Sequence, residues 1–136
     1  MAILITGGAG FIGSHTCVEM LNSGKDVVVI DNLDNSSAES IKRVEKITGK
    51  RISFYENDVC DKEALRKIFK NESIEAVIHF AGLKAVGESV REPIRYYDNN
   101  LISTLSLIEV MNEFGVKNIV FSSSATVYGV AKTMPL

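Results

Sequence analysis

The sequence predicts an α/β protein built on a doubly wound parallel sheet, and three observations support this fold class. Five short apolar, β-branched runs recur along the chain, with helical stretches between them. The runs are apolar throughout instead of alternating with polar residues, which is typical of parallel strands covered by helices on both faces. The first run leads directly into a glycine-rich turn and a helix, as in a βαβ unit.

The predicted elements alternate regularly along the chain. Strands are expected at residues 3–6, 27–31, 52–56, 76–80 and 118–122. Each intervening segment carries one apolar stripe at helical spacing. The four stripes are Cys17, Val18 and Leu21; Ile41 and Val44; Leu65, Ile68 and Phe69; and Leu101, Leu105, Ile108 and Met111. Gly24, Gly49 and Gly115 lie where helices should end, because glycine adopts a left-handed C-terminal cap without a Cβ clash.

Short, right-handed connections favour the strand order 3-2-1-4-5. The sheet then reverses direction between its first and fourth strands, and ligands are expected above that switch point. No internal repeat, low-complexity tract or interdomain linker interrupts residues 1–136. The sequence therefore predicts one Rossmann-type domain over residues 1–136, incomplete because its later strands are missing.

Composition and charge exclude several classes of protein. With 46% hydrophobic and 24% charged residues, the chain has the composition of one globular domain. Its 15 basic and 17 acidic residues give a net charge of -2, so we expect no nucleic-acid partner and no binding to an anionic membrane. No apolar run has the length of a signal peptide or a membrane span, which favours the cytoplasm. Cys17 and Cys60 are interpreted as packing residues, and no metal site is expected.

The turn after the first strand contains two overlapping glycine spacings. Gly7, Gly10 and Gly13 form GxxGxxG, while Gly8 with the latter two forms GxGxxG. Both spacings allow a tight turn, a close backbone approach and close helix packing. A helix that begins near Phe11 would direct its free N–H groups and positive dipole end at a pyrophosphate. A tight strand-to-helix connection without a ligand is the alternative, but the surrounding strand, helix and downstream acid favour dinucleotide binding.

The acid at the end of the second strand, Asp31, indicates which dinucleotide binds. Its carboxylate can accept hydrogen bonds from both adenosine ribose hydroxyls, whereas a 2′-phosphate beside it would meet a like charge. NAD is therefore favoured over NADP as the cofactor. Asp58, just after the third strand, could accept from the adenine amino group, although a plain turn residue is an equally good interpretation.

Specific segments of this chain resemble a known family. Residues 6–15, Thr-Gly-Gly-Ala-Gly-Phe-Ile-Gly-Ser-His, are similar to the opening of the extended short-chain dehydrogenases/reductases. Residues 31–33, 79–89, 96–100 and 121–129 narrow the resemblance to the UDP-hexose 4-epimerases within that family. The most discriminating part is Gly-Leu-Lys-Ala-Val-Gly-Glu-Ser at residues 82–89, because dehydratases share the glycine turn and the serine-rich strand more widely.

The resemblance implies a role for individual residues around NAD. It places the pyrophosphate, the adenosine ribose, adenine and the nicotinamide half against successive parts of the chain. The implied cofactor residues are Gly7, Gly10, Phe11, Ile12 and Gly13; Asp31, Asn32, Leu33, Asn35 and Ser36; Asp58 and Val59; Phe80, Ala81, Gly82, Leu83 and Lys84; and Asn99. Lys84 would reach the ribose hydroxyls from just past the fourth strand, at the mouth of the predicted crevice.

The resemblance also implies a substrate site for a UDP-sugar. Ser124, just beyond the fifth strand, would hydrogen-bond the reacting sugar hydroxyl and assist proton transfer as a catalytic residue. Lys84, Ala125 and Thr126 would contact the substrate with it. A bare Ser-Ser-Ser run more often forms a loop, but its place at the carboxyl edge of the sheet favours a site.

The catalytic Tyr-x-x-x-Lys pair of the family has a literal match in this chain, at Tyr128 and Lys132. We reject this match because the helix that carries the pair should begin well after Ser124, and Gly129 and Pro135 disfavour a helix here. The genuine pair, the remaining strands and the small sugar-binding domain are expected after Leu136.

The implied activity is NAD-dependent epimerisation at C4 of a UDP-hexose, interconverting UDP-galactose and UDP-glucose through a 4-keto intermediate. Residues 1–136 alone are expected to be inactive, and the full-length protein is expected to be a homodimer that pairs through the helix carrying residues 101–111. Another nucleotide-sugar epimerase or a dehydratase is an alternative, as is a module that only binds a dinucleotide. His15 and His79 are interpreted as packing or hydrogen-bonding residues.

Overall fold

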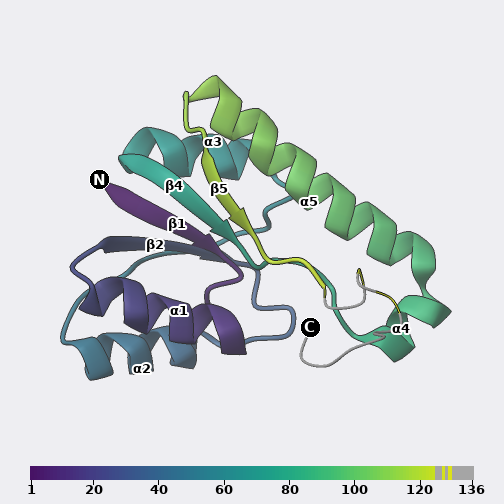
Figure 1. Cartoon of the computed structure of the whole chain (residues 1–136), viewed down its shortest axis with the longest axis horizontal. Coiled ribbons are helices and arrows are strands. Elements are labelled where there is room, and N and C mark those ends of the chain that lie inside the picture. The colour runs from purple at the N-terminus through teal and green to yellow at the C-terminus, as the bar shows by residue number, and fades with distance from the viewer. Residues whose placement is uncertain (125–126, 128, 130–136) are drawn as a thin grey trace.

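Strands and helices alternate from the N-terminus in the computed structural model, which describes residues 1–124, 127 and 129. Figure 1 shows a central sheet with helices on its two sides. The elements, in order, are β1 Ala2–Thr6, α1 Phe11–Asn22, β2 Asp26–Asp31, α2 Ala38–Thr48, β3 Ser53–Glu56, α3 Lys62–Asn71, β4 Ile74–His79, α4 Val86–Arg91, α5 Pro93–Glu113 and β5 Asn118–Phe121.

The sheet has five strands in the order β3-β2-β1-β4-β5. Every neighbouring pair is parallel, with β1 paired to β2 on one side and to β4 on the other. The predicted fold class and strand order are therefore confirmed. The order in which successive strands are added to the sheet reverses between β1 and β4, so the loops after these two strands border the crevice in which ligands bind in this class of fold.

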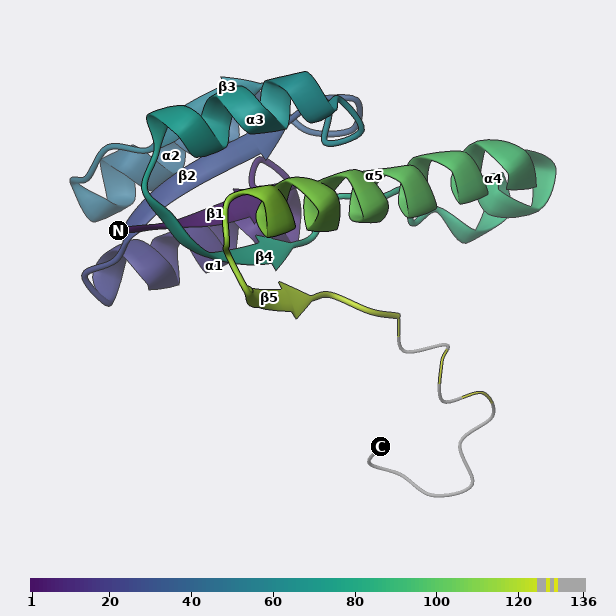
Figure 2. The same cartoon turned by 90° about the horizontal axis from the view of Figure 1, so that it is seen from above.

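Two apolar clusters explain why the strand sequences do not alternate. Leu4 and the side chains that share its face pack with α3 and α5. Ile5 and its neighbours on the opposite face pack with α1 and α2. Both side chains are fully buried although they are adjacent in β1. Figure 1 shows the sheet between the two helical layers, and Figure 2 shows the molecule from above, with α3 and α5 in front of the sheet. Because helices cover both faces, successive residues of the central strands are all apolar.

Capping residues stand at both ends of the helices. Ser37 and Asp61 cap α2 and α3, where their side chains accept backbone N–H groups of the first turn. Gly24, Gly49 and Gly115 follow the ends of α1, α2 and α5 with φ angles of 83°, 67° and 71°. These left-handed conformations confirm the three glycines as helix stops.

The long helix α5 differs from the prediction in which face it buries. Of the four residues in the predicted stripe, only Met111 is buried, whereas Leu101, Leu105 and Ile108 are 55%, 64% and 48% exposed. The core face is formed instead by Leu107 and Val110, together with two serines, Ser103 and Ser106. The serines can be buried because their hydroxyls donate to the backbone carbonyls of Asn100 and Cys60, which satisfies their polar atoms.

Two other features were not predicted. The short helix α4 precedes α5, and Pro93 starts α5 at a position where the missing N–H of proline has no intrahelical role. The edge strand β5 is exposed along its length, with Val120 62% and Phe121 56% accessible. Within the part of the chain that the structure describes, no helix is both long enough and apolar enough to cross a membrane.

Candidate functional site

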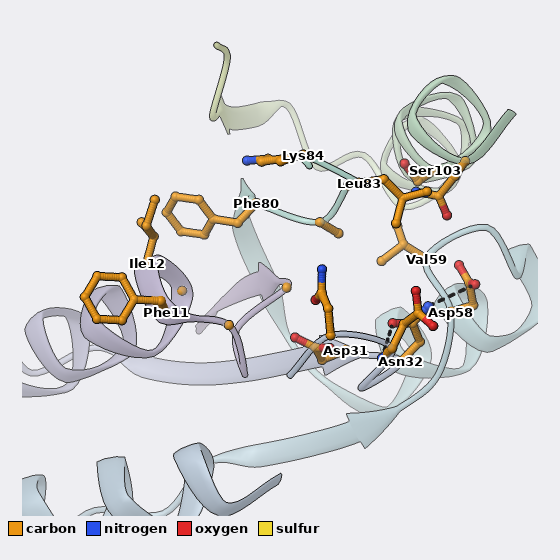
Figure 3. A pocket seen from close by; sticks show the side chains of 18 residues that line it. Phe11, Ile12, Asp31, Asn32, Asp58, Val59, Phe80, Leu83, Lys84 and Ser103 are labelled. Carbon is orange, nitrogen blue, oxygen red and sulfur yellow. Dashed lines mark hydrogen bonds between the residues drawn. The ribbon is translucent and has the colours of Figure 1, made fainter. Parts of the chain in front are cut away.

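A cavity of about 310 Å³ lies at the switch point, over the carboxyl ends of the strands (Figure 3). It is lined by Gly7, Gly10, Phe11, Ile12, Gly13, Asp31, Asn32, Asp34, Asn35, Asp58, Val59, Phe80, Ala81, Gly82, Leu83, Lys84, Asn99 and Ser103. The structure thus brings together all the predicted cofactor residues except Leu33 and Ser36. We refer to this cavity below as the cofactor groove.

The glycines of the first turn are needed for steric reasons. Gly7 has a φ angle of 68°, and a Cβ there would lie 2.9 Å from the backbone N of Ala81. A Cβ on Gly13 would lie 2.2 Å from the carbonyl O of Gly7. Gly8 faces the opposite way, where a Cβ would meet the Val29 side chain at 2.7 Å. The GxxGxxG spacing is therefore the one that lines the groove, while Gly8 packs the turn against β2.

The helix after this turn presents its positive end to the groove. Gly10 occupies the N-cap of α1 without a capping side chain, and no acidic residue lies in the first turn. The first intrahelical bond runs from the Ser14 N–H to the Gly10 carbonyl, at 2.9 Å. The backbone N–H groups of residues 11–13 come before this first bond, so they have no partner within the helix. They lie at the end of α1 that borders the groove. Such a helix end binds a phosphate through its dipole and its amides.

Asp31 has a second task besides facing the groove. Its carboxylate accepts the Ala9 N–H at 2.9 Å, the Leu33 N–H at 3.0 Å and the Ser36 hydroxyl at 2.9 Å. The residue is only 7% exposed. Its three bonds join the glycine turn to the loop after β2. A carboxylate has about four acceptor positions, so one position and the charge remain for a ribose.

The same bonds explain why two predicted residues lie outside the groove. Leu33 has a left-handed φ of 59°, and its side chain packs against the apolar cluster of α1 and α2. Ser36 turns its hydroxyl to Asp31 instead of to the cavity. Leu33 and Ser36 do not line the groove because the local turn directs both side chains away, and their assignment to the cofactor stays a prediction.

The far end of the groove contains Asn32 and Asp58, whose side chains are joined by a hydrogen bond of 3.3 Å (Figure 3). Asp58 also accepts the Cys60 N–H at 2.8 Å, so it serves as a turn residue while lining the cavity. Both interpretations of Asp58 are thus compatible with the geometry. Two lining residues, Asp34 and Ser103, were absent from the predicted set, and a buried serine in a helix gives no sequence signal for a groove.

A second cavity of about 390 Å³ adjoins the first, and we call it the substrate cavity. Its lining is Ala81, Gly82, Leu83, Lys84, Val86, Ser89, Tyr96, Asn100, Thr104, Phe121, Ser122, Ser123 and Ser124. Two of the predicted substrate residues, Lys84 and Ser124, therefore lie together. The segment from Ala81 to Lys84 borders both cavities, which places Lys84 between the cofactor groove and the substrate cavity.

Part of the predicted substrate site lies outside the residues that the structure describes. This applies to Ala125 and Thr126, and to the rejected pair Tyr128 and Lys132. Gly129, which separates that pair in the sequence, has a φ of 64°. A left-handed residue interrupts a right-handed helix, so this angle supports the rejection.

His79 is a neutral hydrogen-bonding residue beneath the two cavities. Its Nδ1 lies 2.7 Å from the Thr6 hydroxyl and its Nε2 lies 3.1 Å from the Thr104 hydroxyl. Thr104 donates to the Asn100 carbonyl and Thr6 accepts the Ala81 N–H, so the imidazole carries its proton on Nε2. Burial, with a smaller contribution from the Lys84 charge, lowers the pKa of His79 to about 4.

The other histidine and the cysteines have structural environments. The His15 ring bonds to the Phe11 carbonyl at 2.8 Å and contacts the Phe11 ring. Burial raises the pKa of the Cys17 thiol to about 12 and that of the Cys60 thiol to about 11. Among the residues placed by the structure, no cluster of three or more histidine, cysteine or acidic side chains could hold a metal ion.

Comparison with known proteins now identifies the family. A family model described as GDP-mannose 4,6 dehydratase matches residues 4–136. The chain belongs to this family. It is 65% identical over its whole length to UDP-glucose 4-epimerase of Bacillus subtilis and 62% identical to that of Haemophilus influenzae. It spans 40% of the length of each relative. The predicted resemblance to UDP-hexose 4-epimerases is confirmed.

Solved structures agree with this assignment. The UDP-glucose 4-epimerase of Bifidobacterium longum, in complex with NAD+ and UDP, matches with a TM-score of 0.97 at 56% identity. The match covers 100% of this chain and 41% of that one. The enzyme of Stenotrophomonas maltophila, with bound NAD and formylated UDP-arabinopyranose, matches with a TM-score of 0.96 at 44% identity, over 100% and 40% of the two chains.

Proposed function

We propose that residues 1–136 form the truncated NAD-binding domain of an enzyme that epimerises C4 of a UDP-hexose, interconverting UDP-galactose and UDP-glucose. The observation that carries this proposal is the joining of the cofactor groove to the substrate cavity at Lys84. An enzyme of this kind must hold a dinucleotide and a sugar side by side, because the reacting atoms have to meet. The epimerases that this chain resembles include structures that hold NAD with UDP or with formylated UDP-arabinopyranose.

The residues of the groove fit NAD. The glycine turn leaves no room for side chains at Gly7 and Gly13, so a pyrophosphate can approach the backbone and the N-terminus of α1. Asp31 supplies the negative charge that suits a ribose with free hydroxyls. When bound, NAD would supply the hydride acceptor and donor for the sugar C4, which makes a 4-keto sugar the intermediate.

This chain would contribute position and electrostatics. Lys84 offers a cation and donors to hydroxyls from either cavity, and Ser124, which also lines the substrate cavity, would offer a hydroxyl to the sugar. We infer that the tyrosine base, its lysine partner and the small sugar-binding domain belong to the part of the protein after Leu136. The 40% coverage of the relatives supports this inference.

Two alternatives remain, and they differ in chemistry. Another nucleotide-sugar epimerase or a dehydratase would use the same groove, and the matching family model is itself described as a dehydratase. The identity of 55–65% to UDP-glucose 4-epimerases favours C4 epimerisation. A module that only binds a dinucleotide would not need the substrate cavity. A cytoplasmic location stays a prediction from the sequence.

The choice of cofactor can be tested through Asp31. We expect NAD to bind more tightly than NADP, because the carboxylate repels a 2′-phosphate. Replacing Asp31→Asn should narrow the difference in binding free energy by about 1–3 kcal/mol, the range for hydrogen bonds to charged groups. Calorimetric titration of the full-length protein with both cofactors measures this difference.

The ratio of the NAD and NADP affinities is the informative quantity. The new amide also disturbs the loops that Asp31 joins, which weakens the binding of both cofactors. Asp26→Asn is the matched control, since Asp26 lies exposed at the other end of β2. An unchanged ratio in Asp31→Asn would remove this residue from cofactor selection.

We also propose that the full-length protein is a homodimer. The outward face of α5 carries an apolar stripe of Ile94, Leu101, Leu105 and Ile108, each at least 48% exposed. A continuous apolar stripe on a long helix suits packing against a second copy, because a closed dimer buries the same face of both chains. The exposed strand β5 would instead be covered by later strands of its own chain.

Sedimentation of the full-length protein tests the pairing. The wild type should sediment as a dimer, and Leu105→Glu should sediment as a monomer because the charge would be buried in the interface. Lys117→Glu, at an exposed position after α5, is the control and should remain dimeric. A wild type that is monomeric at micromolar concentration would contradict the proposal.

A further inference from the structure

The backbone on either side of Lys84 is held by two side chains of α5. Asn100 makes a two-point contact with Leu83, accepting its N–H at 2.8 Å and donating to its carbonyl at 3.0 Å. The Tyr96 hydroxyl accepts the Ala85 N–H at 3.1 Å. These three bonds bracket Lys84 in the segment between the end of β4 and the start of α4.

The two side chains belong to one polar stripe of α5. Tyr96, Asn100 and Thr104 follow one another at intervals of four residues, so they share one face of the helix. All three line the substrate cavity. Thr104 lies 3.1 Å from Nε2 of His79 and donates to the Asn100 carbonyl at 2.9 Å. The bond to His79 fixes the stripe relative to β4, so Asn100 and Tyr96 lie at defined positions beside the loop.

The loop leaves room for the Asn100 side chain at Gly82. Gly82 has a φ of 152°, and a Cβ there would lie 3.1 Å from the Oδ1 atom of Asn100. Tyr96 is tied on its other side, where its hydroxyl donates to Glu88 of α4 at 2.7 Å. Burial, followed by the hydrogen bond to the Glu88 carboxylate, raises the pKa of Tyr96, which keeps its hydroxyl protonated as this donor. The loop from Gly82 to Ala85 is therefore held from α5 at both ends.

We propose that Asn100, assisted by Tyr96, is a positioning residue that sets Lys84 at the boundary between the cofactor groove and the substrate cavity. The role of Lys84 in this inference rests on the proposed function, whereas the contacts of Asn100 with Leu83 do not. Asn100 suits the task because its amide offers a donor and an acceptor to the N–H and the carbonyl of one residue. Neither aspartate nor alanine can do both.

The substitution Asn100→Asp separates positioning from packing because it conserves size. One carboxylate oxygen can still accept the Leu83 N–H, but the other replaces a donor and faces the Leu83 carbonyl. Two acceptors repel each other, so the loop must move and carry Lys84 with it. Asn100→Ala removes both bonds without repulsion, and Tyr96→Phe removes the bonds of the Tyr96 hydroxyl to the Ala85 N–H and to Glu88.

The decisive experiment is a double-mutant cycle in the full-length protein between Asn100→Asp and Lys84→Met. NAD affinity and kcat/KM for UDP-galactose are measured, with thermal unfolding beside them. Loss of a hydrogen bond to this loop should lower both quantities about 10-fold in the wild-type background. In the Lys84→Met background the same substitution should change them at most about 2-fold, because the group that it displaces is already absent.

Three results would overturn the proposal. The first is that the fold-losses caused by Asn100→Asp and Lys84→Met multiply in full in the double variant. The others are that Asn100→Asp changes neither NAD affinity nor kcat/KM, or that unfolding of the variant accounts for its whole loss. Asn112→Asp, at an exposed position of the same helix, is the matched control and should leave all three readouts unchanged. A wild type that binds NAD but lacks epimerase turnover would refute the proposed function, while the affinity cycle would still test the positioning.

Hydrogen exchange provides a second test, which begins with the wild-type protein. The Leu83 and Ala85 amides should exchange slowly in the wild-type protein, because each donates to an α5 side chain. Tyr96→Phe should accelerate exchange at Ala85 and leave most of the protection at Leu83. If Asn100→Asp does not fold, the exchange rates of the Leu83 and Ala85 amides test the proposal. It would be overturned if both amides exchanged in the wild type as fast as in an unfolded peptide.

Discussion

A polypeptide of residues 1–136 should convert UDP-galactose to UDP-glucose at least about 10²–10⁴ times more slowly than the full-length protein, because a general base contributes a factor of that size. Loss of the sugar-binding part should slow the reaction further. Positioning of reactants can account for about 7–11 kcal/mol of barrier reduction, which Lys84 and Ser124 cannot replace alone. Turnover of purified samples at equal NAD saturation measures the difference.

The control for this expectation is Tyr128→Phe in the shorter polypeptide. Tyr128 and Lys132 match the spacing of the catalytic pair, but Gly129 between them has a left-handed φ of 64°. The substitution should therefore leave the residual rate of the shorter polypeptide unchanged. Robust turnover that Tyr128→Phe abolishes would refute our rejection of this pair, and with it the inference that the base lies after Leu136.

The strands and the glycine turn could be predicted because their sequence requirements are strict. A strand covered on both faces must be apolar at successive positions, as in the run from Val27 to Ile30. A turn in which a Cβ would meet backbone atoms at Gly7 and Gly13 must contain glycine. Such constraints act at single positions, so they can be recognised without knowledge of the rest of the fold.

The orientation of α5 could not be predicted in the same way. Apolar residues lie on more than one face of this helix, and the outward stripe with Leu101 and Leu105 is the more regular one in the sequence. The inward face uses Ser103 and Ser106, whose burial depends on carbonyl partners elsewhere in the fold. Periodicity identifies the helix, but the choice of buried face depends on its tertiary neighbours.

The candidate site was predictable in its membership and less so in its internal bonds. The resemblance assigned Asp31 and Lys84 to the cofactor, and both residues line the groove. It did not indicate that Asp31 also joins two loops, because that task depends on backbone N–H groups brought together by folding. The contact of Asn100 with Leu83 was missed for the same reason, since a polar residue at one helix position gives no sign of a backbone partner in another segment.

The glycine turn yields the second large effect: replacing Gly13→Ala in the full-length protein should abolish measurable NAD binding. The added Cβ would lie 2.2 Å from the Gly7 carbonyl O and 2.8 Å from the Gly8 Cα, and neither backbone atom can rotate away. The turn must therefore open, which displaces the N–H groups of α1 from the pyrophosphate. Overpacking typically costs about 1–3 kcal/mol of stability, and a clash of a Cβ with backbone atoms belongs at the upper end.

Two other glycine substitutions calibrate this loss. Gly10→Ala would place a Cβ 3.3 Å from the Gly7 carbonyl, so a small shift can relieve it and the loss of NAD affinity should be smaller. Gly87→Ala in α4 meets nothing within 4 Å and should stabilise the protein by about 0.5–1 kcal/mol, because alanine suits a helix better. Calorimetry with NAD and thermal unfolding measure all three variants. If Gly13→Ala bound NAD as tightly as Gly87→Ala does, the close approach of α1 to the turn would not be what creates the phosphate site.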